Sequence, residues 1–215
     1  DGIRLSDPTA FGSVSPSSVG MIGIERVEVQ QGPCSSRFGA ESMGGVVALY
    51  TNQAAPAGLA GEVALGAGSQ SILRGRASAS YGFDGAWVRA AVDRDQEAQA
   101  TETAKDYRSH GAFLAAGFNL GADTVTSFSY RNTYQAVPIP YQSVSPTVRT
   151  YDANRETSSR NQQVIGSIRS GLSSSLLAEL SLGYAEINRW EPNDYAMPKR
   201  QEPFTGRRAQ VVAGL

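Results

Sequence analysis

The sequence predicts a protein dominated by β-structure, in which a small α+β unit at the N-terminus precedes antiparallel, membrane-spanning strands of a β-barrel. Three observations carry this prediction. The first 52 residues hold a separate pair of strands, apolar residues recur with a period of two from residue 59 onward, and short and long connections alternate between the periodic segments.

The N-terminal unit is organised around residues 24–51, IERVEVQQGPCSSRFGAESMGGVVALYT. In its first strand Val27 and Val29 share one face, and Arg26 and Glu28 share the other. One packed face and one polar face are expected of a small sheet that lies against a polar interior.

The rest of this stretch contains residues with special backbone properties. The Gly-Pro pair at residues 32–33 ends the first strand, because proline cannot donate a hydrogen bond to a ladder. Ser35 is placed to cap a short helical turn. The Gly-Gly pair at residues 44–45 allows a close backbone approach before residues 46–49, which are apolar on both faces and predict a central, buried strand. Residues 53–58 are the expected linker to the barrel.

About eight periodic segments follow, each near the ~9–11 residues that a tilted strand needs to cross a bilayer. In residues 73–83, Leu73, Tyr81 and Phe83 share one phase, and Arg74 and Arg76 occupy the other. This alternation predicts a strand with one apolar and one polar face. The same pattern recurs in residues 63–67, 86–93, 112–120, 126–131, 164–172, 176–184 and 209–215.

The connections between these segments alternate in length. Tight turns rich in Gly, Asp and Ser are predicted at residues 83–86, 120–123 and 171–175. Long polar connections are predicted at residues 94–110, 134–161 and 189–206. Short turns on one side and long loops on the other are typical of outer-membrane barrels, whereas a soluble sandwich rarely separates its loops so regularly.

The two phases are expected to meet different surroundings. Small and aliphatic side chains suit lipid, and Arg, Ser, Glu and Gly on the other phase suit a wet or plugged interior. Aromatic residues near the ends of the segments are expected to form two girdles, with ordinary half-buried strand positions as the alternative. They are Tyr81, Phe83 and Phe118 beside the short turns and Tyr130, Tyr134, Tyr184 and Trp190 toward the long connections.

Composition excludes several classes of protein. The 215 residues carry a formal net charge of -1, so the chain lacks the basic footprint of a nucleic-acid-binding protein. The single cysteine, Cys34, cannot form a disulfide within the chain and is expected to be a small buried residue. No run of about 18 apolar residues predicts a transmembrane helix, and Asp1 opens on a segment that is not a signal peptide.

Enzymatic function is not expected, and neither is a cofactor or a metal centre. His110 is the only histidine and has no nearby cysteine or paired carboxylates; at the end of a long connection it is expected to be solvated or interfacial. GAGSQS at residues 66–71 lacks the third glycine and the helix of a dinucleotide loop. Asp93 and Asp95 share a strand face at the mouth of the barrel, where they form either a cation-binding pair or a solvated pair.

Residues 24–51 resemble the C-terminal part of the plug domain of TonB-dependent outer-membrane receptors. That family has the pattern IERIEV, then Gly-Pro, then S-x-x-Y-G-x-x-A-x-G-G-V-I-N-I-x-T, and residues 1–8, DGIRLSDP, are similar to its upstream DG-V-x-L segment. Departures at Phe38, residues 42–43 and residues 48–50 broadly keep size or apolarity. The matching positions are Ile24, Glu25, Arg26, Val27, Glu28, Val29, Gly32, Pro33, Ser35, Gly39, Gly44, Gly45, Val46, Val47 and Thr51.

The resemblance implies a multi-pass barrel in the outer membrane of Gram-negative bacteria, in contact with lipid. A plugged barrel needs about 22 strands, so residues 1–52 are expected to end a plug and residues 59–215 to begin the barrel of a longer receptor. Alone, this fragment is expected to aggregate through its two unpaired sheet edges. The family imports ferric siderophores most often, and also cobalamin or other chelates. The inner-membrane TonB complex supplies energy through an N-terminal box that this sequence does not contain.

The resemblance also implies where a ligand is met. The plug apical loop corresponds to residues 5–18, and long connections form the outer loops, with plain loop composition as the alternative reading of any one residue. The candidate ligand-binding residues are Asp7, Thr9, Phe11, Ser13 and Ser15 in the plug and Tyr141, Arg149, Tyr151, Trp190 and Tyr195 in the outer loops.

Charged side chains of the plug are expected to meet charges of the barrel wall. Arg26, with Glu25 or Glu28, is a candidate to pair with wall charges, since buried charges are tolerated when they are paired. The candidate wall residues are Arg74, Arg76, Glu62 and Glu179. A solvated ion pair without a role is the alternative. Two other classes of protein also remain open, a non-energised structural or adhesive outer-membrane barrel and a secreted β-sandwich binding module.

Overall fold

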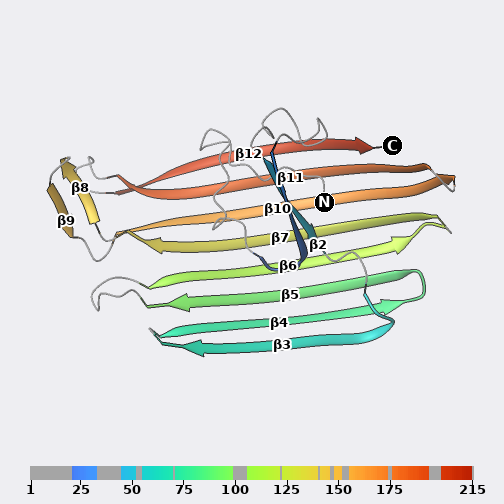
Figure 1. Ribbon diagram of the computed structural model, residues 1–215, viewed down its shortest axis with the longest axis horizontal. Coiled ribbons are helices and arrows are strands. Elements are labelled where there is room, and N and C mark those ends of the chain that lie inside the picture. The colour runs from blue at the N-terminus through green and yellow to red at the C-terminus, as the bar shows by residue number, and fades with distance from the viewer. Residues whose placement is uncertain are drawn as a thin grey trace.

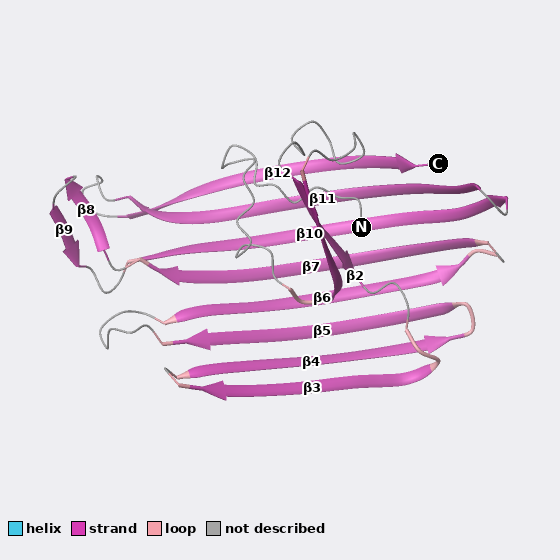
Figure 2. Ribbon diagram, in the orientation of Figure 1, coloured by secondary structure: helices cyan, strands magenta, loops and turns pink. Residues whose placement is uncertain are grey.

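The described residues of the chain form β-strands and their connections. In this computed structural model they are residues 21–32, 45–51, 55–69, 71–98, 106–121, 123–139, 141–145, 148–151, 155–173, 176–193 and 200–214. Figure 2 shows strands and loops in these residues and no helix. They therefore contain no helix long and apolar enough to cross a membrane.

The strands of these residues form three antiparallel sheets. The largest has eight strands in the order β12-β11-β10-β7-β6-β5-β4-β3, and two hairpins, β1-β2 and β8-β9, form the others (Figure 1). The bounds are β1 (Ile24–Gln31), β2 (Gly45–Thr51), β3 (Gly58–Gly68), β4 (Ile72–Phe83), β5 (Ala86–Glu97), β6 (Tyr107–Asn119), β7 (Thr124–Pro138), β8 (Tyr141–Ser145), β9 (Val148–Tyr151), β10 (Glu156–Ser173), β11 (Leu176–Asn193) and β12 (Arg200–Gly214).

The large sheet is a meander of eight strands, as the sequence predicts, but its later strands are longer than expected. Strands β7, β10, β11 and β12 have 15 to 18 residues. The predicted connections at residues 94–110, 134–161 and 189–206 are correspondingly shorter, since strands occupy both ends of each. Hydrophobic alternation marks only the part of a strand that has one apolar face. Backbone pairing continues beyond it, where both faces are polar.

One face of the sheet, here called the outer face, carries the predicted lipid-facing residues. Its side chains include Leu65, which is 83% exposed, and Leu73, Val92 and Leu114. The strand register places the predicted aromatic residues in rows on this face. Phe83 is opposite Ala86 and Ala86 is opposite Phe118, while farther along Leu114 is opposite Tyr130. The face is apolar along a continuous band, as expected of a surface that meets lipid.

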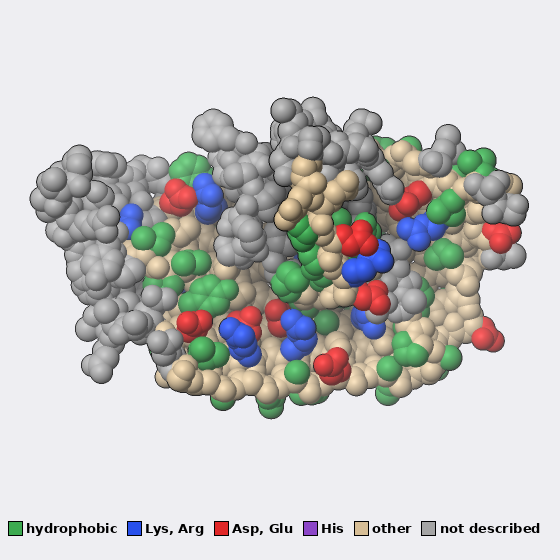
Figure 3. Space-filling view, in the orientation of Figure 1, with side chains coloured by type: hydrophobic (Ala, Val, Ile, Leu, Met, Phe, Trp, Pro, Cys, Tyr) green, Lys and Arg blue, Asp and Glu red, His purple; other side chains and the backbone are tan. Residues whose placement is uncertain are grey.

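The opposite face, here called the inner face, buries polar side chains. It carries the buried residues Arg131, Thr133, Gln135, Asn161, Gln163 and Ser181. The β1-β2 hairpin lies across this face (Figure 1), and Figure 3, which views the same side, shows Arg, Asp and Glu side chains there. The hairpin therefore lies on the polar side of the sheet.

The hairpin itself is paired from Gln31 opposite Gly45 to Ile24 opposite Thr51. Within the described residues β2 has β1 as its one partner, and Val47 is 65% exposed. The predicted burial of residues 46–49 is therefore wrong at Val47, while the central position of this strand stays a prediction. Apolar composition on both faces identifies a strand, but it does not determine how many neighbours the strand has.

A small apolar cluster joins the segment before β1 to the inner face. Ile22 is 1% exposed and packs with Ala91, Phe113 and Ala115. The next residue, Gly23, has a φ of 72°, and a Cβ atom there would overlap the Phe113 ring. A glycine is required at this position both by the backbone conformation and by the close approach.

Gly23→Ala should loosen this contact more than the matched change Gly32→Ala. Gly32 also has a positive φ, 88°, but a Cβ atom there meets nothing within 4 Å. Both changes should lower the free energy of unfolding by about 1 kcal/mol through the left-handed backbone, and overpacking against Phe113 should cost Gly23→Ala about 1–3 kcal/mol more. Trp87 packs on the cluster, so hydrogen exchange of the peptides around Trp87 and Phe113, followed in the full-length receptor in detergent, is a direct readout of this contact.

Adding Phe113→Ala separates the two contributions. The extra loss of Gly23→Ala should disappear in the Gly23→Ala/Phe113→Ala variant, because the overlapping ring is gone. Equal losses for Gly23→Ala and Gly32→Ala would show that Ile22 and Gly23 do not dock on the sheet in this way.

Candidate functional site

The candidate site is the part of the inner face formed by β5, β6, β7, β10 and β11. Two neighbouring rows of side chains cross these strands by direct register. One row is Ala91, Phe113, Arg131, Gln163 and Ala185, and the next is Asp93, Gly111, Thr133, Asn161 and Ile187. Because side chains alternate along a strand, these residues share one face while Leu114 and Tyr130 point to the other.

Arg131 is the most unusual residue of this face. It is 6% exposed, and its guanidinium carbon lies 5.7 Å from the centroid of the Phe113 ring. Its Nε and Nη2 atoms are buried without a hydrogen-bond partner. The contact with the ring stabilises the cation, but buried N–H groups without acceptors cost about 1–3 kcal/mol. Arg131 therefore has unused capacity to bind an anion or a carbonyl oxygen.

Asp93 is the acidic counterpart two strands away. It lies directly opposite Arg76 on β4, and Asp95 lies directly opposite Arg74. The Oδ1 atom of Asp93 is buried without a hydrogen-bond partner. The sequence predicted that Asp93 and Asp95 share a strand face, and the register places that face on the inner side of the sheet, where each carboxylate is opposite an arginine.

Amide and hydroxyl groups pair with one another elsewhere on the inner face. The Nε2 atom of Gln135 donates to the Tyr107 hydroxyl at 2.8 Å, and the Nε2 atom of Gln163 donates to Asn161 Oδ1 at 3.3 Å. Within the described ranges, no group of three or more His, Cys, Asp or Glu residues could hold a metal ion. The arrangement offers donors and acceptors to a polar molecule, which is the chemistry of binding.

Several predicted site residues lie outside the described part of the chain. This is true of the plug-loop candidates Asp7, Thr9, Phe11, Ser13 and Ser15, of Tyr195, and of the motif residues Pro33, Gly39 and Gly44. Gly45 is described. Its φ is 134°, and a Cβ atom there would lie 2.6 Å from the Gln30 carbonyl oxygen, so the chain approaches its neighbour closely at this position.

The predicted outer-loop residues other than Tyr195 occupy strands. Tyr141, Arg149 and Tyr151 belong to the β8-β9 hairpin, where Tyr141 is opposite Tyr151 and Ser143 is opposite Arg149. Trp190 lies in β11, opposite Ser158 and Pro203, so its expected loop position is wrong. His110 likewise lies within β6, opposite Arg94 and Tyr134. Both residues lie near strand ends at which the neighbouring side chains on both faces are polar. The apolar/polar alternation that marks a strand is absent there.

The charged residues predicted to join the hairpin to the sheet lie next to partners within the hairpin or within the sheet. Arg26 Nε lies 3.2 Å from Glu28 Oε1, and its guanidinium lies 4.4 Å from the Tyr50 ring, whose hydroxyl donates to Glu28 at 3.0 Å. Both charged side chains are more than half exposed. Arg74 and Arg76 face Asp95 and Asp93. Contacts between these two sets of charges remain a prediction.

Sequence reasoning did not select Arg131, Phe113 or Ile22 as site residues. The available signal was a cation on the polar phase of residues 126–131. It is a weak signal, because other arginines of the same phase, such as Arg89 and Arg169, are not buried. The contact that Ile22, just before β1, makes with Phe113 distinguishes this part of the inner face from the rest.

No protein-family model matches the sequence, and a search of curated proteins finds no match. Solved structures are similar. The siderophore receptor PiuA from Acinetobacter baumannii matches with 21% identity and a TM-score of 0.66 over 79% of this chain and 27% of that one. FpvAI, in its complex with pyocin S2, matches with 16% identity and a TM-score of 0.70 over 90% of this chain and 28% of that one.

A third structure is the ferripyoverdine receptor of the outer membrane of Pseudomonas aeruginosa, bound to ferripyoverdine. It matches with 16% identity and a TM-score of 0.68 over 90% of this chain and 29% of that one. The chain thus spans less than a third of the length of these receptors. It has the fold of part of such a receptor, which confirms the predicted fold class.

Arg131→Met should raise the free energy of unfolding by about 1–3 kcal/mol, since the thioether fills the space without leaving buried N–H groups unpaired. Arg169→Met is the matched control. Arg169 is paired with Glu179 at 3.5 Å and is 48% exposed, so its loss should change stability by no more than about 0.5 kcal/mol. Chemical denaturation in detergent measures both. A less stable Arg131→Met variant would mean that the guanidinium is favourably paired.

Proposed function

We propose that the chain is part of a TonB-dependent receptor of the outer membrane of Gram-negative bacteria. Residues 1–52 are the C-terminal part of the plug, residues 53–58 are the linker, and residues 59–215 are the N-terminal portion of a plugged barrel. The inferred role of the whole receptor is to bind a scarce nutrient outside the cell and to import it with energy from the inner-membrane TonB complex.

One observation carries the proposal. A hairpin whose sequence resembles the end of a plug lies across the polar face of a barrel-like sheet, while the opposite face is apolar. Ile22, just before β1, packs between Phe113 and Ala91 of that polar face. This is the arrangement expected when a plug fills a barrel from the inside. A secreted β-sandwich would instead direct apolar residues inward between two sheets.

The substrate class that fits best is a ferric siderophore. The inner face carries Arg131, with two unpartnered nitrogen atoms, directly opposite Gln163, and Gln135 lies farther along the same strand. Cationic and amide donors suit the oxygen-rich, anionic groups of an iron chelate. The printed names of the similar structures include a siderophore receptor and a receptor bound to ferripyoverdine, which supports the same class. Cobalamin and other chelates are the alternatives within this reading.

A competing function is a structural or adhesive outer-membrane barrel that imports nothing. It shares the apolar outer face, so the sheet alone does not separate the two. They differ in their dependence on energy. A receptor that contains this chain should accumulate ferric siderophore in cells only when the TonB complex is present, whereas an adhesive barrel should show no uptake in either strain.

Uptake of radiolabelled iron by cells that express the full-length receptor tests the proposal. A panel of ferric siderophores and cobalamin should yield at least one ligand whose uptake is lost in a strain without TonB, while binding to purified receptor is retained. Full-length receptor that is folded, inserted and unable to bind any member of the panel would contradict import of these chelates.

Deletion of residues 5–18, the expected plug apical loop, should weaken binding of the identified ligand by at least about tenfold, as expected when several direct contacts are removed. The measurement is fluorescence quenching or calorimetry on the purified full-length receptor. Unchanged affinity in the deletion variant would exclude this segment from the binding site. Replacement of the segment by a Gly-Ser linker of equal length controls for altered plug geometry.

A further inference from the structure

The outer face of the sheet changes from apolar to polar along its strands, within one step on β5 and β6 and one row earlier on β7 and β10, at Asn132 and Gln162. On β5 and β6, Val92 is opposite Ala112, and these residues end the apolar band. Side chains of one face are two residues apart along a strand, so the next outward pair is Arg94 and His110, which are also directly opposite each other.

This next row continues across two more strands. His110 is opposite Tyr134 on β7, and Tyr134 is opposite Arg160 on β10. We call Arg94, His110, Tyr134 and Arg160 the outer cationic row. Neighbouring strands lie about 4.8 Å apart, so the Cα atoms of Arg94 and Arg160 are separated by about 14 Å. The row therefore presents two separate cations on one line.

The side chains of the row are held in place by polar and ring contacts. The His110 and Tyr134 rings stack with centroids 4.8 Å apart and an interplanar angle of 27°. Arg160 Nε donates to Asn132 Oδ1 at 2.9 Å, and Arg94 Nη2 contacts Gln96 Oε1 at 3.5 Å. Both arginines are exposed, and their direct partners are neutral amides, of which Gln96 in turn donates to Asp106 Oδ2 at 2.9 Å.

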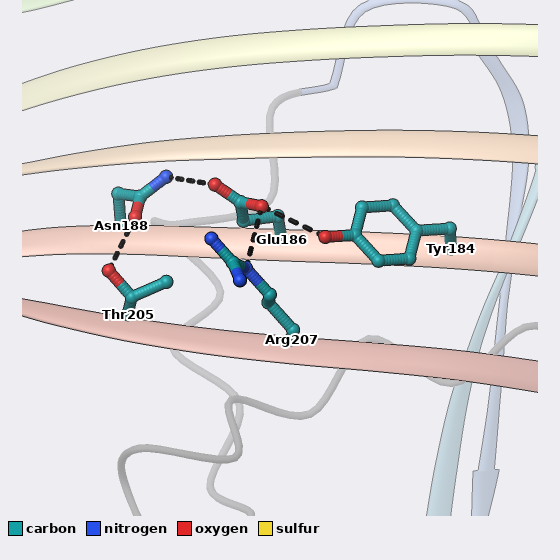
Figure 4. A network of polar contacts seen from close by, with 5 residues as sticks. All are labelled: Tyr184, Glu186, Asn188, Thr205 and Arg207. Atoms are coloured by element: carbon teal, nitrogen blue, oxygen red, sulfur yellow. Dashed lines mark hydrogen bonds and ion pairs between the residues drawn. The ribbon is translucent and has the colours of Figure 1, made fainter.

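Other cations of the outer face differ from these two because they have carboxylate partners. Arg108 lies 3.2 Å from Glu156. Arg207 lies 3.1 Å from Glu186, which also accepts hydrogen bonds from Tyr184 and Asn188 (Figure 4). Among the described residues, no ion pair joins Arg94 or Arg160 to a carboxylate. Among the described residues of the outer face, the arginines without a direct carboxylate partner are thus Arg94 and Arg160.

We propose that the outer cationic row binds the phosphate groups of anionic lipids that surround the barrel. Acyl chains would lie on the apolar band around Val92 and Leu114, and headgroups would then reach the level of the row. Guanidinium groups bind phosphate through charge-assisted hydrogen bonds, and the stacked His110 and Tyr134 rings occupy the interfacial position that amphipathic aromatic side chains favour. The distance between the arginines gives two phosphate contacts, one at each end of the row.

This inference rests on the membrane position of the barrel in the proposed function, but not on the nutrient that the receptor binds. The two can therefore fail separately. A receptor that binds a ferric siderophore but shows no lipid selectivity would contradict only the lipid site. A receptor that selects anionic lipid but binds no chelate would contradict only the proposed cargo.

The test compares lipid retention by the full-length receptor in mixed micelles of detergent, phosphatidylglycerol and phosphatidylcholine. Native mass spectrometry counts the lipids that stay bound. Wild-type receptor should retain phosphatidylglycerol in preference to phosphatidylcholine. The Arg94→Gln/Arg160→Gln variant should lose this preference by about tenfold, since each basic residue near an anionic lipid surface contributes several-fold in affinity.

Two further variants keep the result interpretable. Arg89→Gln/Arg169→Gln removes the same charge from the inner face and should leave the preference unchanged. Arg94→Lys/Arg160→Lys keeps the charge and should retain most of the preference. Equal retention of the two lipids by wild-type receptor, or equal loss in the inner-face variant, would overturn the proposal.

Inorganic phosphate, added at the same concentration to the micelles that contain phosphatidylglycerol, distinguishes a lipid site from a site for a free anion. It should leave the bound lipid in place, because it lacks acyl chains that contact the apolar band. Displacement of phosphatidylglycerol by inorganic phosphate alone at equal concentration would overturn the assignment to lipid.

Discussion

The antiparallel register of the eight-stranded sheet is the constraint on which the other features depend. Side chains alternate between the two faces with a period of two, so a slip of one residue in any strand would exchange its apolar and polar sets. The pairing from Gly61 opposite Ala79 to Leu182 opposite Val211 keeps apolar side chains on one face across all eight strands. The same register aligns Arg131 with Phe113 and Gln163 on the other face.

The two faces of the sheet share one hydrogen-bonded backbone but have side chains suited to different surroundings. In a bilayer every backbone polar group must be paired within the protein, and a meander of long strands provides this pairing. The outer face can then be apolar, whereas the inner face must hydrate or pair its polar side chains. The hairpin lies on that polar face, and the buried residue Ile22, just before β1, inserts where Gly111 and Gly23 leave room. Small residues thus allow an apolar contact inside a polar wall.

Buried polar atoms without partners are concentrated near this contact. Asp93 is opposite Gly111, and Arg131 stacks on Phe113, so both orphaned groups adjoin residues that contact Ile22. A stable wall would be expected to satisfy such groups. The cost of these groups therefore falls on the part of the wall that contacts the segment before β1.

By itself, the sequence determined the strand alternation, the number of strands in the sheet, the side of each strand that carries apolar residues and the resemblance of residues 24–51 to a plug. These features follow from local patterns, because a period of two and a Gly-Pro break can be recognised within one segment, whichever segments lie beside it in the fold. Only the tertiary structure decided the strand lengths, the position of His110 and Trp190 within strands, the exposure of Val47 and the burial of Arg131. Each of these depends on which segments lie side by side, and that information is not carried by the residues of any one segment.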